Sequence, residues 1–232
     1  MTRFLGTMFG PRVSPEELRA NRLRYLAPTL FFMAARVLLI VSIFLPYWHM
    51  ELDAPQYPNG LFLTAYVNHL AGDVKEIDGL NHYIGMRPLG DAAKYERAAS
   101  IWAILAMFLL IEGAAFVHSR WAVALVLPAA LFPVGFLVDL YYWMATFGQN
   151  LDPNAPLSAS VKPFTPTLLG EGGLGQFKTY SEVGHGFWLA TMCSVLIIVA
   201  VVFHRRAYKP LFEREFADRA RAQTDALAAE AP

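Results

Sequence analysis

The chain has 232 residues, of which 56% are hydrophobic and 16% are charged, and its formal net charge is zero. This composition is too apolar for an ordinary soluble domain. A neutral chain lacks the overall basic field of nucleic-acid-binding proteins, so we expect no nucleic-acid partner. The single cysteine, Cys193, excludes an intrachain disulfide and a multi-cysteine metal site.

The first 26 residues are predicted to form a cytoplasmic amphipathic segment. Ser14, Pro15 and Glu17 supply an N-cap serine, a proline at the first helical position and a glutamate at the third, which together make a capping box. We expect a short helix that runs to about Tyr25 and lies against lipid headgroups.

Four apolar stretches are long enough to cross a bilayer core about 30 Å thick, which takes roughly 20 helical residues. They cover residues 27–48, 99–118, 122–147 and 185–204. The first lies too deep in the chain and is too long to be a cleaved signal peptide. The sequence therefore predicts an all-α membrane protein, a bundle of four transmembrane helices with a small external cap formed by its two long loops.

Charged residues interrupt the first three stretches. Arg36 and Glu112 lie at similar depth in the first two, and a charge at the bilayer centre costs about 2.5–3.5 kcal/mol. We expect a structural ion pair between them, with a proton or ion path as the alternative. Asp139, in the third, could face His185 as a hydrogen-bonded pair or as a carboxylate that orients a metal-bound imidazole.

The first long loop, residues 49–98, alternates like a β-strand over residues 61–70. It also contains two histidines and two methionines at suggestive positions: His49, Met50, His82 and Met86. Imidazole and thioether ligands together favour copper, Cu(I) especially, because soft sulfur matches a soft ion. The alternative is that the histidines hydrogen-bond within the folded loop while the methionines fill its core.

The second long loop, residues 148–184, contains a glycine string at 170–175 that matches the pattern of dinucleotide sites. Such a site needs a preceding strand and a following helix in one βαβ unit, so we expect no nucleotide here. Loops of this length are uncommon unless they fold or act. We expect the two loops to pack together as the cap, with some β-strand.

The last segment, residues 205–232, is rich in Ala, Glu and Arg and is predicted to be a cytoplasmic helix. Phe212, Phe216 and Leu227 give it a weak apolar face, which fits either a solvated tail or a docking helix. His118 and His204 stand at the inner ends of two spans, where interfacial snorkelling explains them and a buried haem is poorly placed.

Orientation follows from the distribution of Lys and Arg around the spans. Twelve lie on the side that holds both termini, namely Arg3, Arg12, Arg19, Arg22, Arg24, Arg120, Arg205, Arg206, Lys209, Arg214, Arg219 and Arg221. Six lie in the two long loops, namely Lys75, Arg87, Lys94, Arg97, Lys162 and Lys178. The excess of positive charge predicts that both termini are cytoplasmic and that the loops are periplasmic.

The loop sequences WHMELDAPQYPNGL, LNHYIGMRPLG and PTLLGEGGLGQFKTYSEVGHG resemble an uncharacterised family of four-span bacterial membrane proteins. That family, called Nos B-like, is associated with nitrous-oxide reductase gene clusters of the atypical kind. The resemblance covers roughly residues 45–190 and implies a protein of the bacterial inner membrane. It further implies a part of the machinery that matures a periplasmic copper enzyme or supplies it with electrons, and it assigns no residue roles.

We therefore expect a non-enzymatic accessory membrane protein that supports a periplasmic copper-dependent respiratory enzyme, with lipid and protein partners and copper as the candidate cofactor. The alternative is a cofactor-free structural subunit of a larger respiratory or photosynthetic complex. A carrier fits poorly because the chain has no internal repeat and no pair of broken helices. An enzyme fits least, since no nucleophile, base and orienting group are recognisable together.

Overall fold

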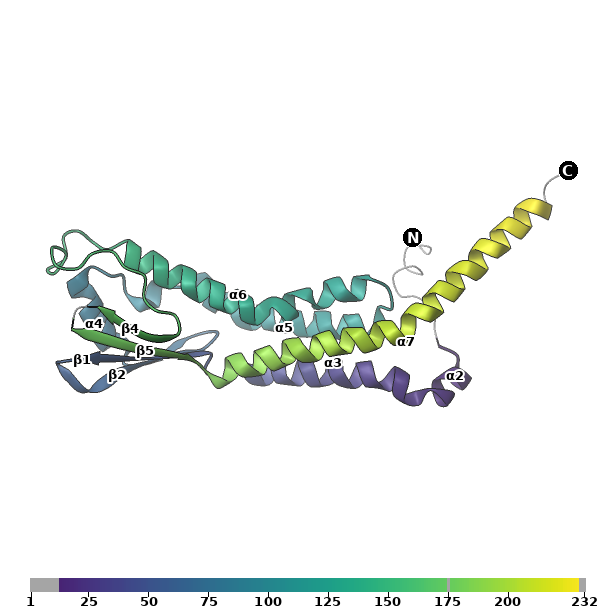
Figure 1. Cartoon of the computed structure of the whole chain (residues 1–232), viewed down its shortest axis with the longest axis horizontal. Coiled ribbons are helices and arrows are strands. Elements are labelled where there is room, and N and C mark those ends of the chain that lie inside the picture. The colour runs from purple at the N-terminus through teal and green to yellow at the C-terminus, as the bar shows by residue number, and fades with distance from the viewer. Residues whose placement is uncertain (1–12, 175, 230–232) are drawn as a thin grey trace. The chain divides into compact units, whose positions relative to one another are not determined.

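A computed structural model describes residues 13–174 and 176–229 (Figure 1). Its contacts divide the chain into two compact units. The first holds the chain up to Val37, Ala106–Ala130 and the part from Cys193 onward. The second holds Leu38–Leu105 and Leu131–Met192.

Four helices of the described chain are long and apolar enough to cross a membrane. They are α3 (Arg22–Ser42), α5 (Lys94–Phe116), α6 (Trp121–Gln149) and the His185–Leu211 part of α7 (His185–Ala229). Large apolar side chains on all four point outward, and Val37, Leu109, Val138 and Ile198 are each more than half exposed. Apolar surface of this extent suits lipid rather than water.

Helix α3 ends at Ser42, six residues before the predicted end of the first span. Ser42 Oγ lies 2.7 Å from the carbonyl oxygen of Leu39 and 2.7 Å from the hydroxyl of the fully buried Tyr47. Pro46 follows, and a proline disfavours helical conformation in the residue before it. Tyr47 N–H then donates to Ala65 O at 2.8 Å, which leads the chain directly into a strand.

Two further boundaries differ from the sequence-based prediction. Helix α2 (Pro15–Ala20) begins at the predicted cap, where Glu17 N–H donates to Ser14 Oγ at 3.2 Å, but it ends at the non-helical Asn21. Helix α7 continues past residue 204 and through Pro210 without interruption, so span and tail form one helix. The side chains of Phe212, Phe216 and Leu227 lie outside the described part of the chain.

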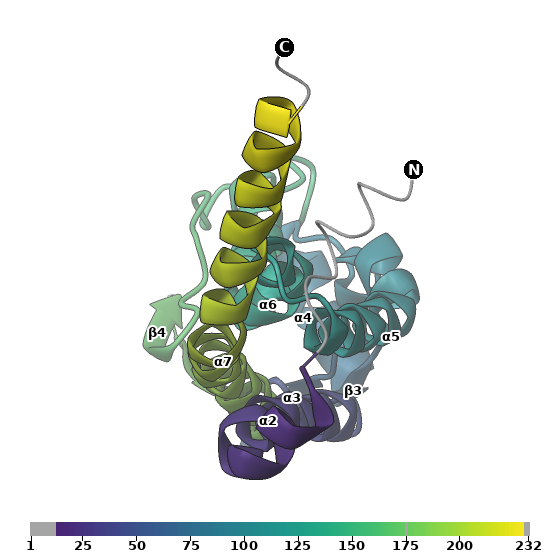
Figure 2. The same ribbon diagram turned by 90° about the vertical axis from the view of Figure 1, so that its right-hand side faces the viewer.

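In the first unit, helix α7 presents a buried stripe with alternating spacings of four and three residues: Cys193, Ile197, Ala200, His204 and Ala207. Small side chains in such a stripe let helices approach closely. Contacts along its length include the ring pair Phe31 and Phe203 at 5.6 Å and the hydrogen bond from Arg24 Nη2 to Arg206 O at 2.7 Å. Figure 2 shows α3 and α7 as neighbours, with α2 beside them.

In the second unit, both long loops contribute to one antiparallel sheet of five strands, in the order β3-β2-β1-β5-β4. The strands are β1 (Trp48–Ala54), β2 (Tyr57–Ala65), β3 (Leu70–Gly72), β4 (Gly170–Leu174) and β5 (Phe177–Val183). The prediction of an all-α chain with some strand thus understated the sheet. The strand-like pattern over 61–70 is divided by a turn in which Tyr66 N–H donates to His69 O.

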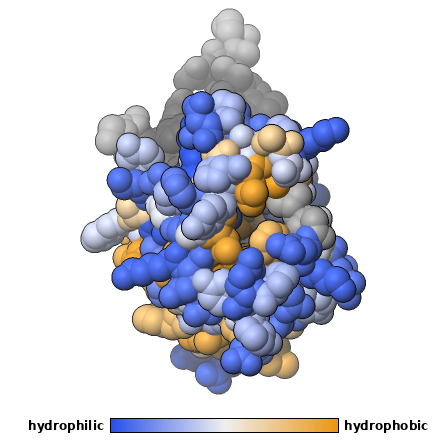
Figure 3. Space-filling model, turned by 90° about the vertical axis from the view of Figure 1, so that its left-hand side faces the viewer, coloured by the Kyte–Doolittle hydropathy of each residue, from blue (hydrophilic) through white to orange (hydrophobic). Residues whose placement is uncertain are grey.

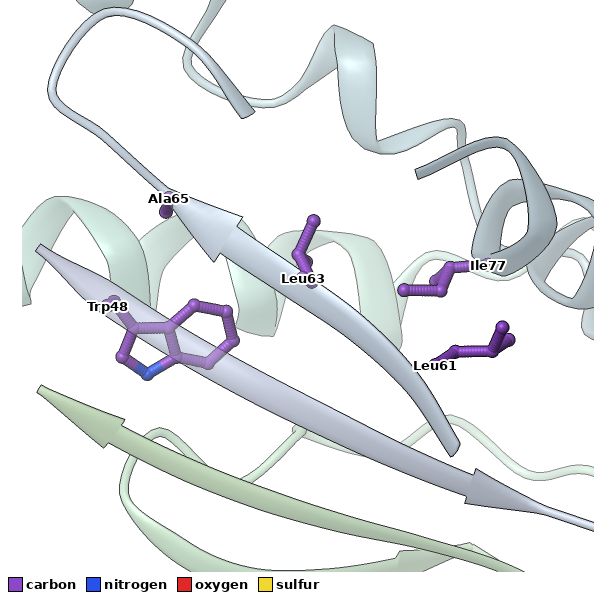
Figure 4. Close-up of a cluster of buried hydrophobic side chains, with 5 residues drawn as sticks. All are labelled: Trp48, Leu61, Leu63, Ala65 and Ile77. Carbon is purple, nitrogen blue, oxygen red and sulfur yellow. The ribbon is translucent and has the colours of Figure 1, made fainter. Parts of the chain in front are cut away.

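Helix α4 (Val74–Ile84), the short 3-10 helix η1 (Leu89–Asp91) and the C-terminal part of α6 pack on one face of this sheet. Trp48, Leu61, Leu63 and Ala65 from the sheet meet Ile77 from α4 in the core (Figure 4). Phe136, Leu140 and Met144 of α6 pack against the same cluster. One sheet face is therefore covered and apolar.

Candidate binding pocket

The register of β1 decides which side chains reach this covered face. Consecutive residues on a strand point to opposite faces of a sheet. Trp48, Met50 and Leu52 contact the apolar core, so His49 and Glu51 belong to the opposite face. In agreement, His49 Nδ1 lies 3.2 Å from the hydroxyl of Thr64, its register partner on β2.

A pocket of about 200 Å³ opens between the covered face, helix α4 and the end of α6. Its walls come from Met50, Leu63 and Ala65 of the sheet, from α4, from four α6 residues and from residues 164–167. The four α6 residues are Leu140, Trp143, Met144 and Phe147. Figure 3, which faces the sheet end, shows apolar side chains gathered in a hollow within a polar surround. For comparison, an engineered apolar cavity of about 150 Å³ binds benzene.

Two polar side chains of the pocket wall have hydrogen-bond partners within the described chain. Trp48 Nε1 donates to Leu168 O at 2.8 Å, and Thr165 Oγ1 accepts from Gln149 Nε2 at 3.0 Å. The buried nitrogens Trp143 Nε1 and Asn81 Nδ2 have no hydrogen-bond partner within the described chain. Asn81 is the more buried of the two residues and is 9% exposed.

The wall of this pocket is uncharged. Among the described residues that line it there is no Asp, Glu, Lys, Arg or His. Transfer of an ionised group into such a site without a partner is strongly unfavourable. The pocket therefore suits a neutral, largely apolar ligand.

The residues predicted to bind copper do not converge on one point. Met50 and Met86 line the pocket, where Met144 joins them. His49 lies on the opposite face of the sheet from Met50, and its Nε2 is near Gly184. His82 is exposed on α4, beside Tyr83. Across the described residues no group of three or more His, Cys, Asp or Glu is placed to hold a metal ion.

Arg36 and Glu112 form a salt bridge in the first unit. The side chain of Arg36 is 16% exposed and that of Glu112 is 39% exposed. The Arg36 guanidinium also lies over the ring of Phe108, 5.4 Å from its centroid. The pair thus holds two opposite charges together on apolar helices, where each alone would be unfavourable.

Asp139 and His185, the other predicted polar pair, are not joined by a hydrogen bond or ion pair in the described chain. Asp139 instead lies close enough to Glu96 to interact with it electrostatically. His185 is exposed at the first residue of α7.

The expectation that His204 snorkels to a headgroup region is wrong, because the residue is 2% exposed. Its ring lies 5.4 Å from that of His118 and 4.8 Å from that of Tyr208. Tyr208 in turn stacks on His118 at 3.8 Å. The spacing of His204 from Cys193, Ile197 and Ala200 was the signal in the sequence, since it places the imidazole on the buried stripe of α7.

Sequence reasoning also missed the pocket residues Asn81, Trp143 and Met144. Asn81 directly precedes His82 in the sequence. Only if residues 74–84 are recognised as a helix does the 3.6-residue period place the Asn81 amide on the buried face and the His82 imidazole on the exposed face. Trp143 lies within the apolar stretch 122–147, which the sequence identifies only as a membrane span. No protein-family model matches the chain, and a comparison with curated proteins gives no match. The resemblance of the loops stays a prediction.

Proposed function

We propose that this chain is a multi-pass membrane protein of the bacterial inner membrane that binds a neutral apolar ligand in its sheet domain. The observation that carries this proposal is the uncharged pocket of about 200 Å³ between the sheet, α4 and α6. Ligand sites of soluble and membrane proteins are typically concave, mostly apolar and equipped with a few polar groups. This pocket has that composition.

Two features support a binding role. Three methionines, Met50, Met86 and Met144, line the pocket, and flexible thioether side chains adapt to ligands of irregular shape. The excess of Lys and Arg beside both termini favours a cytoplasmic location for the termini, and hence a periplasmic sheet domain. The protein would hold its ligand at the outer surface of the membrane, as an accessory to another component.

The test fills the pocket without touching the rest of the sheet. Ala65 lines the pocket and is 6% exposed, so Ala65→Leu adds three carbons to the ligand space. Ala71→Leu is the matched control, because Ala71 pairs with Thr64 and lies on the opposite face. We expect mass spectrometry of organic extracts to find an apolar molecule with the wild type and Ala71→Leu but much less with Ala65→Leu. Equal amounts in all three would contradict the proposal.

Support for a copper-dependent respiratory enzyme is a second candidate function, favoured by the three methionines in one pocket. Thioethers are soft ligands that suit Cu(I). We expect purification under reducing conditions to retain copper, and Met50→Leu with Met86→Leu to lose it. Met192→Leu, a half-exposed methionine outside the pocket, is the control. Metal-free wild-type protein after Cu(I) loading would remove this candidate.

A further inference from the structure

We propose that the ligand is a hydrocarbon chain bearing a neutral carbonyl group, and that Asn81 donates a hydrogen bond to the carbonyl oxygen. The inference rests on the proposed apolar binding function and names its ligand class. It begins from the one polar side chain of the pocket wall that is nine-tenths buried and whose amide nitrogen has no partner in the described chain.

The backbone around Asn81 is fixed. Its carbonyl oxygen accepts from Met86 N–H at 2.9 Å and closes the C-terminal turn of α4, where Gly85 adopts a left-handed conformation with φ of 82°. Ile77 and Ile84, both buried, hold the same face of the helix against the pocket. A buried amide donor is unfavourable without an acceptor. A ligand oxygen would supply that acceptor.

The rest of the wall restricts what can carry the oxygen. No charged side chain among the described lining residues is available to balance a carboxylate, a phosphate or a cation. A neutral carbonyl accepts one hydrogen bond without such a partner. A bare hydrocarbon would leave Asn81 unsatisfied, and a sugar or peptide would bring more polar groups than the wall can bind.

The pocket wall extends along β1 from Trp48 to Leu52 and across all five strands, from Leu70 on β3 to Gly172 and Gly173 on β4. Its apolar lining in both directions suits a hydrocarbon group.

The membrane is the source of such ligands. Leu140, Trp143, Met144 and Phe147 belong to the last turns of α6, a helix apolar enough to span a bilayer. Membranes offer two neutral carbonyl groups on hydrocarbon chains, the ester of a glycerolipid and the ring carbonyl of a lipid quinone. Both satisfy the chemistry of the pocket, and the experiment separates them.

The experiment titrates the full chain in detergent with three probes, measured by native mass spectrometry. The probes are methyl undecanoate, decylubiquinone and undecane, which has no oxygen. We expect the wild type to prefer at least one carbonyl probe over undecane by roughly tenfold, the ratio typical of one buried hydrogen bond. Asn81→Leu, which lacks the amide donor, is expected to lose that preference.

Each outcome is decisive. Tighter binding of methyl undecanoate assigns the glycerolipid ester, and tighter binding of decylubiquinone assigns the quinone. Undecane that binds as well as both carbonyl probes would overturn the role of Asn81 while leaving the apolar site intact. Unchanged undecane affinity in Asn81→Leu shows that this variant is folded. A wild type that binds none of the probes would overturn the proposed function itself.

Discussion

Arg36 and Glu112 illustrate how a single pair of residues makes apolar helices tolerate charge. Each side chain lies on a helix that is long and apolar enough to cross a membrane, and the two are joined by a salt bridge. The side chain of Glu112 is only 39% exposed. The positive charge of Arg36 therefore offsets much of the cost of keeping the Glu112 carboxylate ionised there. Removing one member leaves the other charge uncompensated, whereas removing both restores an apolar contact.

We therefore expect Arg36→Leu and Glu112→Leu each to lower the free energy of unfolding by about 2–3 kcal/mol. The double variant should be more stable than either single one. Unfolding by sodium dodecyl sulfate, followed by circular dichroism, measures these differences. Lys209→Leu with Glu213→Leu is the control, since that pair is mostly exposed and a surface pair contributes at most about 1 kcal/mol.

Two results would count against this structural role. Single variants as stable as the wild type would mean that the salt bridge contributes nothing. A stable double variant that abolishes a proton flux in proteoliposomes, where the wild type has one, would favour the proton path instead. The second measurement is informative because it does not depend on stability.

At the scale of elements, strand β1 explains both the success and the failure of the sequence-based predictions. Two of its residues, His49 and Met50, are adjacent in the sequence and were therefore predicted to bind the same metal ion. The two-residue period of a strand sends them to opposite faces of the sheet. The sequence of the first loop alternates like a strand only over residues 61–70. It therefore gives no sign that residues 48–54 form a strand with His49 and Met50 on opposite faces.

The other elements could be predicted only where a local stretch of sequence determines them. Four apolar helices could be predicted because length and hydropathy are local properties. The pairing of β1 with β5 joins Trp48 to Val183, and no local pattern specifies a partner so distant. The pocket could not be predicted for the same reason, since its walls come from β1, α4, α6 and residues 164–167.

Gly72, at the end of β3, provides a test of the sheet edge. Its φ is 96°, and a Cβ atom there would lie 2.1 Å from the carbonyl oxygen of Phe62. We expect Gly72→Ala to destabilise the sheet domain by at least about 1–3 kcal/mol, the usual cost of a strained backbone. Thermal unfolding, followed by near-ultraviolet circular dichroism, measures the change.

Gly79→Ala is the control for Gly72→Ala. Gly79 lies within α4, has an ordinary φ, and has no atom within 4 Å of the position that a Cβ would take. Alanine exceeds glycine in helix propensity by about 1 kcal/mol, so this variant should be as stable as the wild type or slightly more stable. Equal losses in the two variants would mean that the positive φ of Gly72 is not the cause.

For the whole molecule, two independent properties of the chain agree on a membrane. Apolar side chains cover the outward surface of the four long helices, and Lys and Arg are concentrated in the segments beside the two termini. The first property suits lipid, and the second predicts cytoplasmic termini. The sheet domain is built from the two loops that carry fewer positive charges.

This orientation is tested by labelling single cysteines with a membrane-impermeant maleimide. Cys193 is buried, and Cys193→Ala removes it as a background. Gly79→Cys then places an exposed thiol on α4, in the first long loop. Ala222→Cys places another on α7, in the C-terminal segment that is rich in Lys and Arg. Because the excess of Lys and Arg predicts cytoplasmic termini, spheroplasts should label Gly79→Cys at once and Ala222→Cys only after permeabilisation. The reverse order of labelling would place the pocket in the cytoplasm and rule out any periplasmic partner for it.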